Sequence, residues 1–239
     1  MIKVENLEVR FGGVKPIDQM SVTFPGGTCG LIGPNGAGKT TFFNVLSGFV
    51  KPSGGSVTAF DEDLLAMADY RRARWGLRRT FQTEQAIEEL SLYDNVAMLE
   101  EHSKNNGGSS RREDVEGALG FVGLGKLDPN TKVGTLGARE RRLVEIARAV
   151  VGKPRAVLLD EPAAGLPDEE TEHMGSVIRR IPDEIGALVI LVDHDMNLVS
   201  ACCELTSVLD FGKLIASGPT DEVLRDEKVV RAYLGSEDV

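Results

Sequence analysis

The chain has 239 residues, of which 41% are hydrophobic and 27% are charged, a balance typical of globular proteins. This composition excludes a disordered tail, a fibrous repeat and a small disulfide-stapled domain. The formal net charge of −10 disfavours sequence-independent binding of nucleic acid, because displacing counterions from phosphates requires positive charge. With 27 glycines, we expect tight turns or a close approach of the backbone to a ligand.

Two kinds of segment alternate along the chain. Short apolar runs bounded by glycine or acidic residues predict strands at residues 2–4, 7–11, 21–24, 28–32, 56–59, 156–159, 188–192, 207–211 and 213–216. Apolar residues at helical spacing predict helices at residues 40–47, 111–124, 139–151, 168–180 and over the last twenty residues. Residues 103–110 are rich in turn formers and predict a loop. Buried strands that alternate with helices predict an α/β fold with a mainly parallel sheet covered on both faces.

The sequence holds no membrane-spanning run. The longest apolar stretches, such as residues 187–192, fall far short of the ~20 residues that cross a bilayer. The first residues also lack the apolar core of a signal peptide. Cys29, Cys202 and Cys203 make an odd count without metal-ligand spacing, so we expect buried, reduced thiols in a reducing compartment.

A glycine-rich loop carries the strongest chemical signal. Residues 33–40 read GPNGAGKT and match the pattern G-x-x-x-x-G-K-[ST], in which backbone N–H groups converge on phosphate oxygens. Lys39 supplies a positive charge for the β and γ phosphates, and the Thr40 hydroxyl can bind Mg²⁺. The loop predicts nucleotide binding with these contacts: Asn35, Gly36, Ala37, Gly38, Lys39, Thr40 and Thr41.

Two acids follow a predicted buried strand, in the segment LLDEP at residues 158–162. Ligands of α/β sheets bind at the carboxyl ends of such strands. We expect Asp160 to hold Mg²⁺ through water, and Glu161 to act as the general base for an attacking water. The alternative is a strand that ends in solvated acids, but the phosphate loop in the same chain favours an ATPase.

These motifs, in this order, resemble the ATPase cassettes of ABC transporters over nearly the whole chain. The resemblance implies that Gln82 senses Mg²⁺, γ-phosphate and the permease, that His194 contacts γ-phosphate, and that Phe11 stacks on adenine. Taken singly, Gln82 is an ordinary polar residue, His194 a residue at the core edge and Phe11 a core residue. Their order and spacing together favour the functional interpretation.

The resemblance also implies an architecture. One cassette is expected over residues 1–239, with a RecA-like P-loop NTPase core at 28–82 and 138–239. An antiparallel β subdomain is expected at 1–27 with nearby strands, and a small helical subdomain at 83–137.

Within the ABC superfamily, the chain most resembles the ATPases of branched-chain amino-acid importers. The resemblance is carried by RFGGV at residues 10–14, RTFQ at 79–82, DEPAAGL at 160–166, HDM at 194–196 and RAYLG at 231–235. It implies ATP and Mg²⁺ as cofactors and a cytoplasmic location on the inner face of the cell membrane. The implied partners are integral-membrane permease subunits, a second ATPase subunit and, indirectly, an external substrate-binding protein; no nucleic acid is implied. Related importers carry urea, amides or other small organic acids.

One segment departs from the family pattern. The family signature, LSGGQ or a near variant, is expected where this chain has Leu136, Gly137, Ala138, Arg139 and Glu140. Gly137 lacks the usual hydroxyl, Arg139 replaces a glycine whose N–H approaches γ-phosphate, and Glu140 adds negative charge, which the Arg139 guanidinium can offset. In addition, Pro167 stands where the family's D-loop usually has Asp or Asn.

The altered signature bears on both partner and function. It predicts a weak signature and favours a heterodimer with another ATPase over a homodimer. Two other functions stay open at this point: a non-transport ABC ATPase of DNA repair or translation, and a regulatory subunit with weak hydrolysis.

Overall fold

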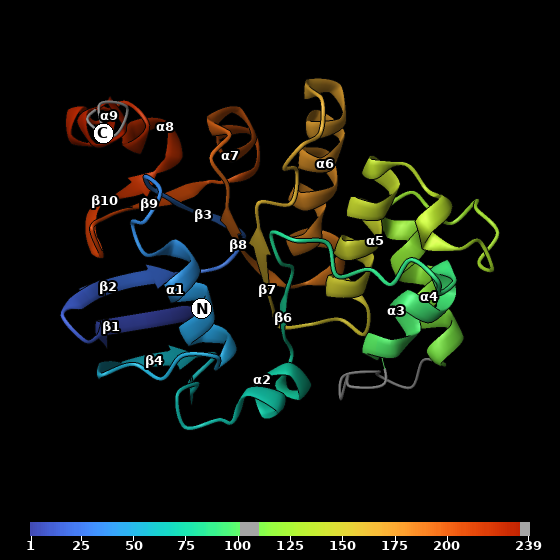
Figure 1. Cartoon of the computed structure of the whole chain (residues 1–239), viewed down its shortest axis with the longest axis horizontal. Coiled ribbons are helices and arrows are strands. Elements are labelled where there is room, and N and C mark those ends of the chain that lie inside the picture. The colour runs from blue at the N-terminus through green and yellow to red at the C-terminus, as the bar shows by residue number, and fades with distance from the viewer. Residues whose placement is uncertain (101–109, 235–239) are drawn as a thin grey trace. The chain divides into compact units, whose positions relative to one another are not determined.

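The computed structural model describes residues 1–100 and 110–234 (Figure 1). The chain forms two compact units, one made of Met1–Arg72 with Ile190–Val239 and the other of Ala73–Val189. We call them unit 1 and unit 2. The predicted loop at 103–110 lies outside the described residues except for Ser110, as do the last five residues of the predicted carboxyl-terminal helix.

Unit 1 contains a four-stranded antiparallel sheet in the order β2-β1-β4-β5. Its strands are β1 (Ile2–Phe11), β2 (Val14–Phe24), β4 (Gly54–Ala59) and β5 (Glu62–Asp63). The two strands predicted at 2–4 and 7–11 are one strand, β1. Its register shifts between Val4 and Leu7, where Asn6 has a φ of 48°. This bulge breaks the period-two alternation, which is why the sequence pattern divides there.

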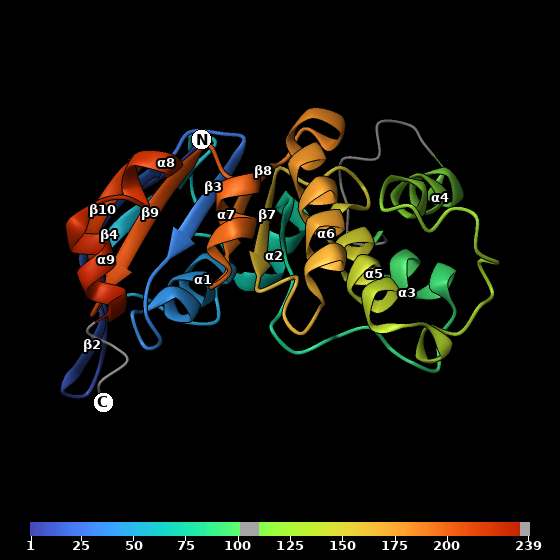
Figure 2. The same ribbon diagram turned by 90° about the horizontal axis from the view of Figure 1, so that it is seen from above.

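The second part of unit 1 surrounds β3 (Thr28–Ile32), all five residues of which are buried. β3 runs parallel to β9 (Leu205–Asp210), and β9 forms an antiparallel hairpin with β10 (Lys213–Pro219). Helix α1 (Lys39–Ser47) follows β3 and ends at Gly48, whose φ is 88°. The remaining helices in this part of the chain are α7 (Met196–Cys202), α8 (Thr220–Val223) and α9 (Glu227–Leu234), as Figure 2 shows.

Unit 2 contains two parallel strands and a group of helices. β6 (Leu77–Arg79) runs parallel to β7 (Ala156–Asp160). Helices α3 (Leu92–Glu100), α4 (Arg111–Phe121) and α5 (Ala138–Val150) pack against one another. α6 (Asp168–Arg180), the 3₁₀ turn Val133–Thr135 and the π turn Ile181–Ile185 complete the unit. The chain passes between the units within α2 (Asp69–Trp75) and β8 (Leu188–Val192).

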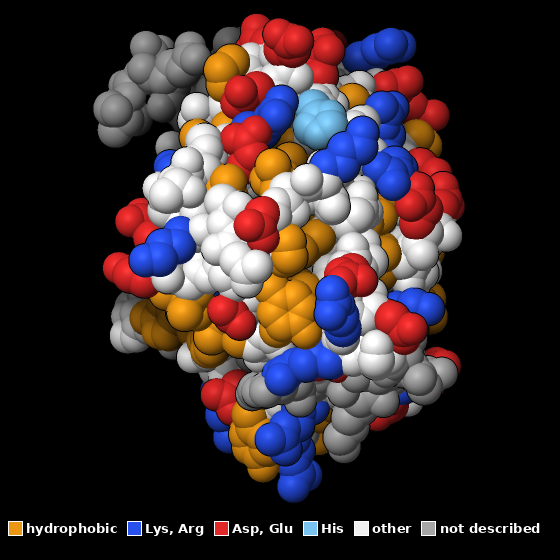
Figure 3. Space-filling view, turned by 90° about the vertical axis from the view of Figure 1, so that its right-hand side faces the viewer, with side chains coloured by type: hydrophobic (Ala, Val, Ile, Leu, Met, Phe, Trp, Pro, Cys, Tyr) orange, Lys and Arg blue, Asp and Glu red, His pale blue; other side chains and the backbone are white. Residues whose placement is uncertain are grey.

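Both units show the predicted combination of helices with parallel strands, so the α/β fold class is confirmed. All three cysteines lie buried as thiols, and burial raises the pKa of Cys29 to about 11. No helix in the described part of the chain has both the length and the apolar character needed to cross a membrane. On the face drawn in Figure 3, acidic and basic side chains are interspersed.

Candidate functional site

The phosphate loop joins β3 to α1 in unit 1, and its glycines are required by the backbone. A Cβ at Gly33 would lie 2.0 Å from the Leu209 carbonyl oxygen, and a Cβ at Gly38 would lie 2.2 Å from that of Pro16. Gly36 and Gly38 also have φ values of 78° and 110°, which L-residues rarely adopt. The tight curl of this loop directs the N-terminus of α1 at the space the loop encloses.

Lys39 spans the loop from its helical end. Its Nζ donates hydrogen bonds to the carbonyl oxygens of Gly33 at 2.6 Å and Pro34 at 3.0 Å. The ammonium therefore lies over the phosphate loop, where the sequence predicts it. Among the other predicted contacts, three residues are exposed to an incoming ligand: Asn35, Gly36 and Thr40. Ala37 and Gly38 are buried, and Thr41 is half-buried.

Two residues to which the sequence analysis gave no role contact the backbone of the phosphate loop. The Gly212 N–H, in the β9–β10 turn, donates to the Ala37 carbonyl oxygen at 3.0 Å. The Tyr233 hydroxyl, on α9, lies beside the Gly33 backbone; burial raises its pKa to about 12, and the interaction with the Gly33 backbone opposes that rise. The sequence used RAYLG only as a family marker, and no local pattern links residue 233 to residue 33.

His194 follows the buried strand β8 and projects outward, with 70% of its side chain exposed. The buried Asp193 carboxylate accepts hydrogen bonds from the backbone N–H groups of His194 at 2.8 Å and Asp195 at 3.0 Å. Asp195 in turn caps α7, because its side chain accepts the N–H groups of Asn197 and Leu198. Asp193, which the sequence analysis missed, thus fixes the turn that presents His194.

Phe11 lies at the end of β1, opposite Val14, with 54% of its surface exposed. An exposed aromatic face is available for stacking. The structure therefore does not bury Phe11 in the core, and its role in adenine stacking stays a prediction.

The acid pair lies in unit 2, at the carboxyl end of β7. Asp160 is buried, and its Oδ2 accepts a hydrogen bond from Arg79 Nη2 at 2.9 Å, with both side chains only 7% exposed. The Asp160 backbone N–H donates to the Thr80 hydroxyl at 3.1 Å. Arg79 was quoted in the sequence as part of RTFQ, but without a role. The pairing of β6 with β7, which sets Arg79 opposite Leu158, provides that role.

The structure brings together Gln82 and Glu161, two of the predicted catalytic residues. Gln82 Nε2 donates to Glu161 Oε2 at 2.8 Å. Glu161 has a φ of 48°, a left-handed conformation that a glutamate adopts only at an energetic cost, which is typical of functional positions. The turn that follows is closed by a hydrogen bond from the Ala164 N–H to the Glu161 carbonyl oxygen at 3.1 Å.

The signature segment forms the start of α5, with Leu136 before the helix and Gly137 as its N-cap. Arg139 Nη2 donates to Glu140 Oε1 at 2.7 Å. Burial raises the pKa of the Glu140 carboxyl, but its own backbone N–H and the Arg139 guanidinium more than compensate, so the pKa falls below its usual value. Arg139 therefore neutralises the negative charge that Glu140 introduces.

The predicted metal ligands have suitable chemistry. The Thr40 hydroxyl, the Gln82 amide oxygen and the Asp160 carboxylate are all hard oxygen donors, which Mg²⁺ prefers. Asp160 also ends a buried strand with its carboxylate held in place. The chemistry of these residues fits Mg²⁺, and their role as its ligands stays a prediction.

Comparison with known proteins identifies the chain's relatives. A family model described as ABC transporter matches residues 17–164. The chain belongs to the ABC transporter family. A second model, described as branched-chain amino acid ATP-binding cassette transporter, matches residues 213–239.

Individual relatives agree with this assignment. The branched-chain amino acid transport ATP-binding protein LivG of Escherichia coli K12 is 33% identical, over 98% of each chain. The lipopolysaccharide export system ATP-binding protein LptB of the same strain is 32% identical, over 99% of this chain and 98% of LptB. Among solved structures, the ADP conformation of the ATP-binding cassette MJ1267 superposes with a TM-score of 0.88 at 28% identity, over 98% of each chain.

The family establishes the general activity. The chain is a nucleotide-binding ATPase subunit of a transporter. This confirms the predicted P-loop NTPase fold and the predicted ATPase activity. LivG and LptB both carry the names of transport-system proteins, which favours transport over a role in DNA repair or translation.

Proposed function

We propose that this protein powers an importer of branched-chain amino acids or a related small polar solute, from the cytoplasmic face of the cell membrane. The match of residues 213–239 to the branched-chain amino acid transporter model is the main support for this transported substrate. The carboxyl-terminal segment also approaches the nucleotide loop through Tyr233. The amino-acid transport protein LivG supports this cargo, whereas LptB belongs to an export system.

We further propose a division of labour among the site residues. Lys39 and the N–H groups of the phosphate loop bind the phosphates and stabilise charge on the transferring phosphoryl group. Glu161 accepts a proton from the attacking water at Oε, and Gln82 holds that carboxylate in place through the contact at 2.8 Å. Thr40, Gln82 and Asp160 would hold Mg²⁺, which when bound neutralises phosphate charge. His194 contributes a further contact to the γ-phosphate.

The partners follow from this role. The chain pairs with a second ATPase subunit, and the pair docks on permease subunits that receive solute from an external substrate-binding protein. Each ATP lies between the phosphate loop of one subunit and the signature of the other. Gly137 and Arg139 in the signature segment favour a partner with a complete signature over a second copy of this chain.

A reconstituted transport assay tests the cargo. The chain is co-purified with its permease subunits, placed in lipid vesicles and supplied with ATP, and uptake of radiolabelled leucine, isoleucine and valine is measured. We expect ATP-dependent uptake in the presence of the substrate-binding protein. ATP-dependent movement of a lipid instead, with no amino-acid uptake, would reject the importer.

A regulatory subunit with weak hydrolysis is the second candidate, and the signature segment favours it specifically. Gly137 offers no hydroxyl, and the Arg139 guanidinium is engaged with Glu140. Phosphate release measured with and without the second ATPase separates the candidates. Release that does not depend on Glu161 of this chain supports the regulatory subunit.

A further inference from the structure

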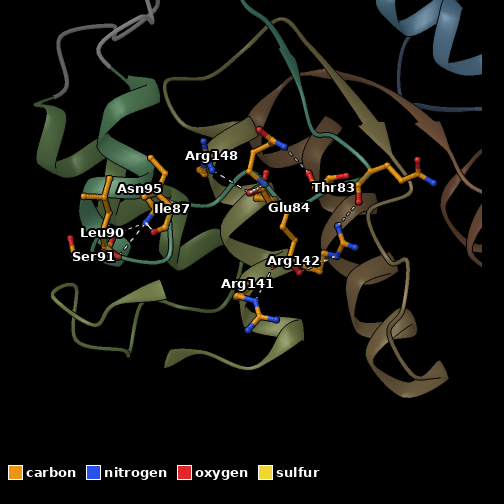
Figure 4. Close-up of polar contacts among 12 residues, drawn as sticks. Thr83, Glu84, Ile87, Leu90, Ser91, Asn95, Arg141, Arg142 and Arg148 are labelled. Atoms are coloured by element: carbon orange, nitrogen blue, oxygen red, sulfur yellow. Dashed lines mark hydrogen bonds and ion pairs between the residues drawn. The ribbon is translucent and has the colours of Figure 1, made fainter. Parts of the chain in front are cut away.

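Helix α5 carries two adjacent arginines, Arg141 and Arg142, immediately after the signature segment (Figure 4). Neither has an assigned role in the proposed function. Only 12% of the Arg142 side chain is exposed, so its charged guanidinium is largely buried in unit 2. Charged side chains are rarely so buried unless hydrogen bonds or ion pairs satisfy them.

Arg142 contacts the backbone of Gln82 and that of the turn after Glu161. Its Nη1 donates to the Gln82 carbonyl oxygen at 3.3 Å, and its Nη2 donates to the Ala164 carbonyl oxygen at 3.1 Å. Ala164 closes the turn that begins at Glu161. One guanidinium thus joins the segment that carries Gln82 to the turn that carries Glu161.

The third nitrogen of the same guanidinium faces an acid. Arg142 Nε lies 3.7 Å from Glu84 Oε1, and Glu84 Oε2 accepts from Arg141 Nε at 3.0 Å. Arg141 also donates to the Leu136 carbonyl oxygen at 2.9 Å. Glu84 therefore lies between the two arginines, and through Arg141 this network extends to the first residue of the signature segment.

Further along α5, the Glu145 carboxylate accepts the backbone N–H of Gln85 at 3.0 Å and pairs with Arg148 at 3.2 Å. Two successive turns of one helix thus bind Gln82, Glu84 and Gln85. Helix α5 therefore connects the signature segment to the segment that carries Gln82.

We propose that Arg142 is a positioning residue for hydrolysis. It sets the Gln82–Glu161 contact by holding the backbone of Gln82 and the turn that follows Glu161. This rests on the proposed roles of Gln82 and Glu161. Arginine is required because its planar fork donates to two carbonyl oxygens while its charge stays near the Glu84 carboxylate, whereas the lysine ammonium is a single point on a flexible stem.

The test compares Arg142→Lys and Arg142→Gln with the wild-type chain, each assembled with its ATPase and permease partners. We expect both variants to lower the kcat for ATP about tenfold and to leave its KM within about twofold, because the phosphate loop is untouched. Arg112→Gln is the matched control, since Arg112 is 77% exposed on α4 and its described partner is the exposed Glu116. This control should retain wild-type kcat.

A double-mutant cycle with Gln82→Ala separates positioning from general support of the fold. If Arg142 acts through Gln82, then Arg142→Gln should add little loss once Gln82 is removed, because residues that act as a unit are not additive. Additive losses, a rise in KM instead of a fall in kcat, or full activity of Arg142→Lys would overturn the proposal. A wild-type assembly without ATPase activity would instead contradict the proposed function.

Discussion

At the scale of single residues, the catalytic assignment depends on contacts between side chains that lie far apart in the chain. Gln82 meets Glu161, and Arg79 meets Asp160. Each carboxylate of the acid pair therefore has its own partner from the RTFQ segment. Charge-assisted hydrogen bonds such as the one from Arg79 are among the stronger polar contacts in proteins, so Asp160 is held in a single orientation.

Replacing the proposed general base should stop turnover but not binding. We expect Glu161→Gln to lower kcat by about 10²–10⁴-fold, because glutamine cannot accept the proton from water. The affinity for ATP should remain close to that of the wild type, since Lys39 and the phosphate loop are unchanged. Phosphate release and binding of a fluorescent ATP analogue measure the two quantities. Turnover at the wild-type rate would show that Glu161 is not the base.

Glu145 makes the free energy of unfolding depend on pH. Burial raises the pKa of its carboxyl above the usual 4.5, although Arg148 and the N–H groups of Gln85 and Ala86 oppose the rise. The native state therefore binds more protons than the unfolded state just above pH 4.5, and its free energy of unfolding falls as the pH rises through the native pKa. Glu145→Gln retains an acceptor for Gln85 but cannot ionise.

The variant should therefore gain stability relative to the wild type as the pH rises from 4.5, and the difference should level off once Glu145 is fully ionised. Urea unfolding at a series of pH values measures this difference. Glu116→Gln, at an exposed position on α4, is the control and should show no such gain. A difference that shrinks with rising pH would contradict the assigned direction of the shift.

At the scale of elements, periodic helices and short apolar strands were predictable, and a short polar strand was not. Helices α5 and α6 start and end within one residue of the predicted bounds. β6 was missed because it has only three residues, two of them arginines. Arg78 is nevertheless buried and donates to the Ala73 and Leu99 carbonyl oxygens. Tertiary hydrogen bonds thus make a strand from a segment that local polarity disfavours.

The start of α3 depends on one buried amide. Asn95 is fully buried; its Oδ1 accepts the Ile87 N–H at 2.8 Å, and its Nδ2 donates to nearby carbonyl oxygens, among them those of Ile87 and Ser91 (Figure 4). These bonds shape the segment between Gln82 and α3. No sequence pattern distinguishes Asn95 from a surface asparagine.

Asn95→Ala should lower the free energy of unfolding by roughly 2–3 kcal/mol, because several buried backbone groups lose their partner. Chemical denaturation measures this loss. Asn130→Ala is the control, since Asn130 is exposed and its side chain bonds to the nearby Asp128; we expect a change within about 0.5 kcal/mol. Equal stabilities of the two variants would show that the Asn95 network contributes nothing.

At the scale of the whole molecule, the two halves of the predicted chemistry lie in different units. Unit 1 holds the phosphate loop and His194, and unit 2 holds Gln82, the acid pair and the signature segment. The predicted division into a core, a β subdomain at 1–27 and a helical subdomain at 83–137 stays a prediction. Helices α3 and α4 do fall within 83–137.

The signature segment makes a prediction about assembly. Two copies of this chain should hydrolyse ATP at least tenfold more slowly than the chain paired with an ATPase that has a complete signature, since removing one donor to a phosphoryl group costs about 10²–10³ in rate. Phosphate release from the purified chain, alone and with its partner, measures this ratio. Rapid hydrolysis by the homodimer, unchanged by Arg139→Ala, would reject a weak signature.

The sequence by itself determined the nucleotide loop, the acid pair and the family. Each of these depends on short contiguous segments whose chemistry requires particular residues at fixed spacing. Such a pattern can be recognised without knowing the fold. Only the tertiary structure decided which residues support them: Arg79 for Asp160, Arg142 for the Gln82 and Glu161 segments, and Gly212 for the phosphate loop. Such contacts join segments 22 or more residues apart, for instance 81 residues for Arg79 and Asp160. Strand pairing and helix packing set these contacts, and neither can be read from local spacing.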